Sequence, residues 1–239
     1  MAKAKKKLTE QQKYILWMMA FAVFTIILWR VPFGMLVLYP FTILSTWFHE
    51  MAHGIMALIL GGSFHQLEIY ADGSGLAVWS GNLFLGNVGK AIVAAAGPLG
   101  PTAAGAILII LSKKEKHIKK ILYTFSCKLA FSVIYWIRSV YGIPVILTFA
   151  VIIFFAALKM QAKNQKLLLI FIGIQAFLSI YLSIGYLMSQ EAFIDNDFHI
   201  SDTGVIAQNL FLPYWIWGGI IIFISIFTMI QSILYVYKK

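Results

Sequence analysis

The sequence predicts an all-α polytopic membrane protein with about six to seven membrane segments and a small β-hairpin. Of its 239 residues, 61% are hydrophobic and only 12% are charged, whereas soluble domains average about a quarter charged residues. The apolar residues fall into long runs, and no Pro/Gly/Ser-rich linker or internal repeat divides them. We therefore expect a single integral membrane domain over residues 1–239, and we exclude a water-soluble globule.

The formal net charge of +10 comes from lysines that sit in short clusters between the apolar runs. Such clusters anchor membrane loops on the cytoplasmic side, because their translocation is costly and anionic lipid attracts them. The lipid bilayer is therefore the expected partner of these lysines, and nucleic acid is not expected as a partner. The clusters are Lys3–Lys7, Lys113–Lys120, Lys159–Lys166 and Lys238–Lys239.

Several runs approach the roughly 20 apolar residues that a membrane-spanning helix needs. They are residues 14–29, 33–60, 88–111, 118–140, 143–158, 167–188 and 213–236. The run 14–29 is expected to be a retained N-terminal anchor helix, because its small-x-small triplet lies in the middle of the run. Region 33–111 then holds a His-Glu motif helix, the hairpin and a Gly-Pro helix, and region 112–239 holds the remaining helices with the segment around Asp202. Pro40 is expected to kink or break the second run.

The lysine clusters constrain the topology of the later segments better than that of the first ones. If the clusters at 113–120, 159–166 and the C-terminus are all cytoplasmic, the last four segments form two helical hairpins. Three early crossings would then put the N-terminal lysines on the opposite side from the cluster at 113–120. Either the N-terminus is external or one early segment re-enters without crossing, and both alternatives stay open.

A β-hairpin is predicted after the second apolar run. Residues 64–70 and 75–80 flank Ala71-Asp72-Gly73-Ser74, and an Asp-Gly pair between apolar-rich runs is a hairpin signal. Open strand edges are not tolerated against lipid, so this hairpin is expected at an interface or under cover of helices.

A metal-binding motif, His49-Glu50-Met51-Ala52-His53, lies inside the second apolar run. Residues four apart project from the same face of a helix, so His49 and His53 can direct ring nitrogens at one metal ion. Glu50 is one position further along and can reach a metal-bound water as a general base without being a ligand. Ionisable side chains at membrane depth are costly and functional by default, which favours a Zn2+ site over a packed polar pair.

A catalytic zinc site needs a third protein ligand. In the polar segment before the last apolar run, Asp202 competes with Asp195, Asp197 and His199 for this role, and a capping role for Ser201 or Asp202 at a helix N-terminus is an equal alternative. The other candidates have ordinary explanations: His65 as a half-exposed strand residue, Asp72 as a turn former and His117 as a solvated loop residue. Glu68 in the hairpin also remains a candidate.

Lys128 falls deep in the run 118–140. Its simplest explanation is that the side chain snorkels toward an interface. At its depth it could also pair with an acidic residue or line a water path, and its role stays open.

These motifs together resemble the site-2-protease-type intramembrane zinc metallopeptidases, in particular their compact branch without a PDZ domain. The matching stretches are Phe48-His49-Glu50-Met51-Ala52-His53-Gly54, Gly61-Gly62, Asp72-Gly73-Ser74-Gly75, Ala95-Ala96-Gly97-Pro98-Leu99-Gly100-Pro101, and Ser201-Asp202-Thr203 with Pro213 and Trp217. The resemblance implies that His49, His53 and Asp202 are the zinc ligands and that Glu50 is the general base. Larger members place the ligand aspartate in an Asn-Pro-Asp-Gly or Leu-Asp-Gly context, where this chain has Ser201-Asp202-Thr203-Gly204.

The expected function is that of a zinc-dependent intramembrane endopeptidase, a hydrolase that cleaves transmembrane helices of membrane-protein substrates. Because such a substrate must unwind before attack, a strand edge of the hairpin could hold it extended, and proline at Leu67 or Ile69 is expected to lower turnover. The alternatives are a non-proteolytic transporter or regulatory scaffold that keeps the fold, and a zinc enzyme that acts on lipid. Glu50 favours an enzyme, because a structural zinc site needs no base.

Overall fold

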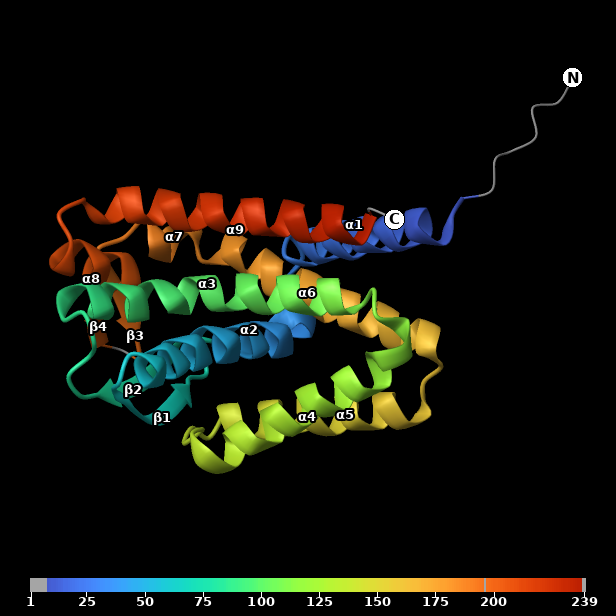
Figure 1. Ribbon diagram of the computed structural model, residues 1–239, viewed down its shortest axis with the longest axis horizontal. Helices are drawn as coiled ribbons and strands as arrows, with labels where there is room; N and C mark the ends of the chain where they lie inside the picture. Colours follow the sequence, from blue (N-terminus) through green and yellow to red (C-terminus); the bar gives the residue numbers. More distant parts are fainter. Residues whose placement is uncertain (1–7, 196, 238–239) are drawn as a thin grey trace, which may run out of the picture.

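The computed structural model describes residues 8–195 and 197–237, so the lysines at 3–7 and 238–239 lie outside the described residues. The chain forms a bundle of long helices with two small β-hairpins at one end (Figure 1). The first half comprises α1 (Glu10–Leu28), α2 (Pro32–Ile59), β1 (Ser63–Ile69), β2 (Gly75–Ser80) and α3 (Asn87–Leu111). The second half comprises α4 (Ile118–Tyr135), α5 (Gly142–Lys159), α6 (Ala162–Leu182), α7 (Ile184–Leu187), β3 (Glu191–Ile194), β4 (Asp197–Ile200), α8 (Asp202–Asn209) and α9 (Tyr214–Tyr237).

Each of the apolar runs predicted from sequence is helical over most of its length. In the described chain, four helices are long and apolar enough to cross a membrane: α3, α5, α6 and α9. The apolar part of α1, Gln12–Leu28, is shorter. Helix α2 contains two histidines, a glutamate and an internal proline, and α4 contains several lysines; neither is among these four. The expected count of six to seven segments is therefore not established.

The first two helices run in the same direction. Along α1 and α6, the pairs Tyr14 with Lys166, Thr25 with Gln175 and Arg30 with Tyr181 show that these helices are parallel. Both α2 and α6 are antiparallel to α3. The connection between α1 and α2 is residues 29–31, which span at most about 10 Å and cannot return the chain across the bundle.

The start of α1 therefore lies at the same end of the bundle as the lysine-rich connections after α3 and α5. Figure 1 shows this end on the right, with α2 continuing from the α1 side toward the hairpins. The arrangement does not match an N-terminus on the opposite side from these connections. Over the described residues it also contains no re-entrant early segment, because α1 and α2 continue in one direction.

Helix α2 is continuous through Pro40, so the expected break does not occur. It begins with Pro32 in the first turn, where a missing N–H costs nothing. At its other end, Gly61 has φ +87° and Gly62 N–H donates to the Ala57 carbonyl. This is a Schellman cap, which only a residue that tolerates positive φ can form readily.

The predicted hairpin is present, and its first strand is covered on both sides. Strands β1 and β2 pair antiparallel, with a bulge at His65. On the outer side of β1, Leu67 N–H donates to the Trp136 carbonyl and Arg138 N–H donates to the Leu67 carbonyl. The predicted run 118–140 therefore ends as a helix at Tyr135, because the residues after it pair with β1.

A second hairpin, β3–β4, forms in the polar segment before the last apolar run and was not predicted from the sequence. It leads directly into α8, which packs against α3 and α9. The second hairpin thus carries the chain from α7 to the position where Asp202 faces α2.

Candidate metal centre

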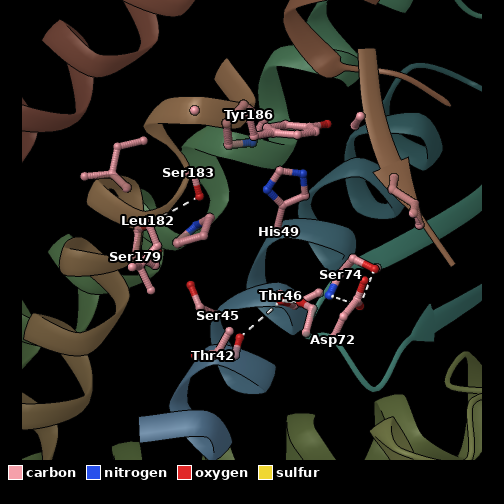
Figure 2. Close-up of a pocket in the computed structure, with 18 of the residues that line it drawn as sticks. Thr42, Ser45, Thr46, His49, Asp72, Ser74, Ser179, Leu182, Ser183 and Tyr186 are labelled. Atoms are coloured by element: carbon pink, nitrogen blue, oxygen red, sulfur yellow. Dashed lines mark hydrogen bonds between the residues drawn. The ribbon is translucent and has the colours of Figure 1, made fainter. Parts of the chain in front are cut away.

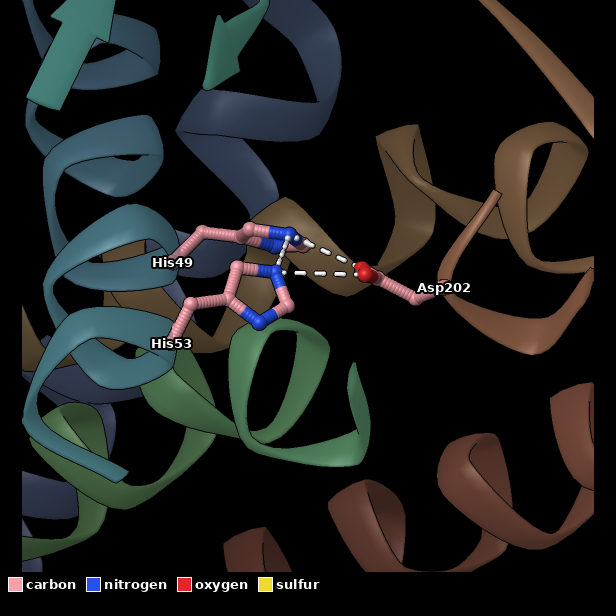
Figure 3. A group of neighbouring side chains, drawn as sticks. All are labelled: His49, His53 and Asp202. Carbon is pink, nitrogen blue, oxygen red and sulfur yellow. Dashed lines mark hydrogen bonds and ion pairs between the residues drawn. The ribbon is translucent and has the colours of Figure 1, made fainter. Parts of the chain in front are cut away.

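The two motif histidines lie one turn apart on α2 and point the same way (Figure 3). Their Nε2 atoms are 3.1 Å apart. The other ring nitrogen of His53, Nδ1, lies 2.7 Å from the Val93 carbonyl on α3. A hydrogen bond from one ring nitrogen to a carbonyl fixes the tautomer and leaves the other nitrogen as an acceptor, which is how metal-bound histidines are oriented.

Asp202 reaches the same point from α8, more than 140 residues later in the chain. Its Oδ2 lies 3.0 Å from His49 Nε2, and its Oδ1 lies 3.2 Å from His53 Nε2. Burial raises the pKa of this carboxyl, but the two adjacent histidines outweigh burial and hold the pKa of Asp202 below its usual value. Among the described residues, His49, His53 and Asp202 form the one group of histidine and acidic side chains close enough to hold a metal ion.

Different residues cap the N-terminus of α8 and contact the histidines of α2. Ser201 is the N-cap of α8, and its hydroxyl accepts from Gly204 N–H at 3.0 Å. Thr203 donates its hydroxyl proton to the carbonyls of Leu187 and Ser189. Asp202 is the first helical residue between these two anchors, so its carboxylate is free to face α2.

The geometry of these three side chains fits a zinc ion. Tetrahedral ligands at 2.0–2.1 Å from zinc lie about 3.3–3.4 Å from one another, close to the separations of 3.0 to 3.2 Å seen here. Although Oδ2 of Asp202 lies near His49, it makes no hydrogen bond of acceptable geometry and is buried. A buried carboxylate oxygen without a hydrogen bond is costly unless a cation satisfies it.

Glu50 is buried beside the group, with Oε1 4.0 Å from His49 Nε2. The Ala77 backbone of β2 lies close to its carboxylate. Gly75 lies equally close, because a Cβ there would come within 2.8 Å of Glu50 Cγ and 2.6 Å of Thr46 Cγ2. The hairpin and α2 thus hold Glu50 between them.

The Gly-Pro segment of α3 lies directly against the two histidines. A Cβ at Gly97 would overlap Nε2 of His53 and lie 2.7 Å from Nε2 of His49. Pro101 has no N–H, so the Gly97 carbonyl loses its usual helical partner near the site. Both prolines lie inside a continuous α3.

A cavity of about 510 Å³ opens beside His49 and Glu50 (Figure 2). Hydroxyl side chains from α2 and α6 line it, together with the tip of the first hairpin and residues of β3. Figure 2 shows Tyr186 across from His49, and the Tyr186 hydroxyl accepts from Asp202 N–H at 3.0 Å. The labelled lining residues are Thr42, Ser45, Thr46, His49, Asp72, Ser74, Ser179, Leu182, Ser183 and Tyr186.

The remaining candidates from sequence lie elsewhere. Asp195 and Asp197 are exposed at the turn of the second hairpin. Neither of them, nor His199, belongs to the group formed by His49, His53 and Asp202. The other candidates have local partners: Asp72 accepts from Ser74 in the turn, His65 contacts Ser80, and Glu68 accepts from Gln66 and Tyr70. His117 is exposed in the connection before α4.

Val93 and Tyr186 contact the metal group but were not predicted from the sequence. A backbone carbonyl carries no residue signature, and a single tyrosine next to a hairpin has no distinguishing pattern. These partners were therefore recognisable only from the packing of α3 and α7 around α2 and α8.

A helical protein with a buried His-His-Asp group, an adjacent glutamate and several membrane-type helices has the features of a membrane metallopeptidase. A family model described as Peptidase M50B-like matches residues 16–232. The chain belongs to this family, the site-2-protease family, as the resemblance predicted. Comparisons with curated proteins and with solved structures find no match.

Proposed function

We propose that this protein is a multi-pass, zinc-dependent intramembrane endopeptidase that cleaves transmembrane helices of membrane-protein substrates. The observation that carries the proposal is the convergence of His49, His53 and Asp202 at separations that suit zinc, with buried Glu50 beside them. Membership of a peptidase family and four membrane-type helices in the described chain support it.

The proposed roles follow from the positions of the side chains. His49, His53 and Asp202 would hold zinc, which when bound lowers the pKa of a water molecule and polarises a substrate carbonyl. Glu50 would accept the proton of the attacking water and return it to the leaving amine.

The outer edge of β2 is the part of the hairpin that suits an extended substrate. Leu67 and Ile69 direct their amides away from β2, to Trp136 and to the Ser139 hydroxyl. Their cross-strand partners are Ala77 and Gly75. In a non-hydrogen-bonded pair both residues point their backbone groups outward, so Gly75 and Ala77 face the other edge, beside Glu50.

This assignment changes the strand that we expected to bind substrate. The outer edge of β1 is occupied by residues 136–139, so proline at Leu67 or Ile69 would break the fold before it could test substrate binding. The outer edge of β2 has no strand partner in the described chain. An unwound substrate segment could add to it as a further strand, with its backbone held next to the base.

The decisive experiment measures zinc content and cleavage of a transmembrane substrate in the same purified preparations. Wild type is expected to hold about one zinc per chain and to cleave. Glu50→Gln should keep zinc and lose cleavage, because the ligands are intact and the base is absent. Asp202→Ala should lose zinc and cleavage together.

Asp195→Ala is the matched control, since it removes an exposed aspartate of the same polar segment. It should keep both zinc and cleavage. A wild-type protein that binds no zinc in the folded state would contradict the proposal, as would cleavage by Glu50→Gln at the wild-type rate.

A further inference from the structure

A second, larger hollow lies on the opposite side of α2 from the metal group. The cavity at the site is lined by Ser45, Thr46, His49 and Glu50, whereas this groove is lined by the intervening positions of α2, including Phe48, Met51 and Ile55. Its other walls are α3 and α4, and its volume is about 1250 Å³. Helix α2 therefore separates a hydroxyl-lined cavity from an apolar groove.

The groove is long and apolar. It follows α3 from Ile92 to Leu111, a length of roughly 28 Å at 1.5 Å per residue. Most of its lining residues are aliphatic or aromatic. Hydrocarbon chains therefore suit its length and its lining.

The groove is lined by basic residues without acidic ones. Lys120, Lys128 and His117 all come from the α4 side, and no aspartate or glutamate is among the lining residues. Within the described chain, neither Lys120 nor Lys128 forms an ion pair with an acidic side chain. Lys120 lies next to the lysine-rich connection, and Lys128 is about 12 Å further along α4.

Lys120 lies next to the polar connection, whereas Lys128 lies on the apolar groove further along α4. A cation on an apolar surface below the membrane interface is unfavourable unless an anion accompanies it. Anionic lipid headgroups attract cations at the membrane surface, with hydrocarbon chains attached below. An occupant with a phosphate near Lys120 and Lys128 and with chains along α3 satisfies both the charge and the shape of the groove.

We propose that the groove between α2, α3 and α4 is a binding site for an anionic phospholipid of the bilayer. The phosphate lies between Lys120 and Lys128, and the acyl chains lie along Ala103, Ala104 and Ile107 of α3. This site is separate from the metal group and does not depend on the proposed protease function.

The test reconstitutes the protein in mixed micelles with equal amounts of phosphatidylglycerol and phosphatidylcholine and measures retained lipid by native mass spectrometry. Wild type should retain phosphatidylglycerol in preference to phosphatidylcholine. The variants Lys120→Met and Lys128→Met should each lower this preference about fivefold. Ala104→Phe, which fills the groove and keeps the charge, should reduce retention of both lipids.

The matched control is the pair Lys159→Met and Lys163→Met, which removes the same charge from exposed lysines outside the groove. Zinc content and thermal stability report folding of every variant. The proposal is overturned if wild type retains the two lipids equally, or if the control pair loses phosphatidylglycerol as strongly as the groove variants. Unchanged retention in Ala104→Phe would also overturn it.

Discussion

Gly97 of α3 and His53 of α2 are in direct contact, so closely that a Cβ at position 97 would overlap the Nε2 atom of His53. The same Cβ would lie 2.7 Å from Nε2 of His49. The Gly-Pro segment therefore closes one side of the metal group with backbone alone. Glycine is required here by close approach, since it sits inside a helix where any L-residue could adopt the backbone conformation.

Gly97→Ala is expected to abolish zinc binding. The added methyl group occupies the space of the two nitrogens, so α2 and α3 must separate or the rings must rotate. Metal analysis of the purified protein should show at least a tenfold loss of bound zinc, with helical content retained. Gly219→Ala on α9, where a Cβ meets nothing within 4 Å, is the control and should bind zinc normally. Full zinc occupancy in Gly97→Ala would show that the histidines are not the ligands.

Tyr186→Phe is expected to weaken zinc binding about 10- to 100-fold, the range typical for loss of a partner that orients a metal ligand. The Tyr186 hydroxyl accepts from the Asp202 backbone N–H, and its loss leaves that donor without its partner and Asp202 less firmly placed. Competition with a zinc chelator measures the change. Tyr181→Phe is the control, because among the described residues its hydroxyl accepts from exposed Arg30 and lies away from the metal group. Equal zinc affinity in Tyr186→Phe and wild type would show that the Tyr186 hydroxyl does not support zinc binding.

Backbone methylation of a substrate peptide tests strand addition to β2. Antiparallel pairing uses the amide of every second residue, so N-methylation should slow cleavage strongly at one set of alternate positions near the scissile bond. At the other set it should have a small effect. The rates of a methylated series on wild-type protein give this comparison directly. A uniform effect at all positions would exclude pairing with the outer edge of β2.

Zinc is expected to stabilise the folded protein by binding to His49, His53 and Asp202. At a free zinc concentration 100-fold above Kd, a site that forms only in the folded state adds about 2.7 kcal/mol to the free energy of unfolding. Chelation should therefore lower the melting temperature of wild type, and addition of zinc should restore it. Asp202→Ala should melt at the same temperature with and without chelator; a zinc-dependent shift in this variant equal to that of wild type would contradict its role as a ligand.

The sequence alone predicted more of the helices and the motif than of their arrangement. The apolar runs are largely helical, and Asp72 forms the predicted turn. Gly61-Gly62 cap α2. These features depend on local periodicity, turn chemistry and backbone conformation, which nearby residues determine. The second hairpin was missed, because the polar segment around Asp195 has no strong strand pattern.

The sequence by itself determined that a His-Glu motif lies on an apolar helix, with His49 and His53 on one face, because helical spacing is local. Only the tertiary structure decided that Asp202, and not one of its neighbours, lies against the two histidines. It also showed that Ser201 caps α8. It also decided that the outer edge of β2 is free while that of β1 is covered, and that Lys128 faces an apolar groove. These outcomes depend on how α3, α4 and α8 pack against α2, and contacts between residues far apart in the chain leave no pattern that spacing alone can reveal.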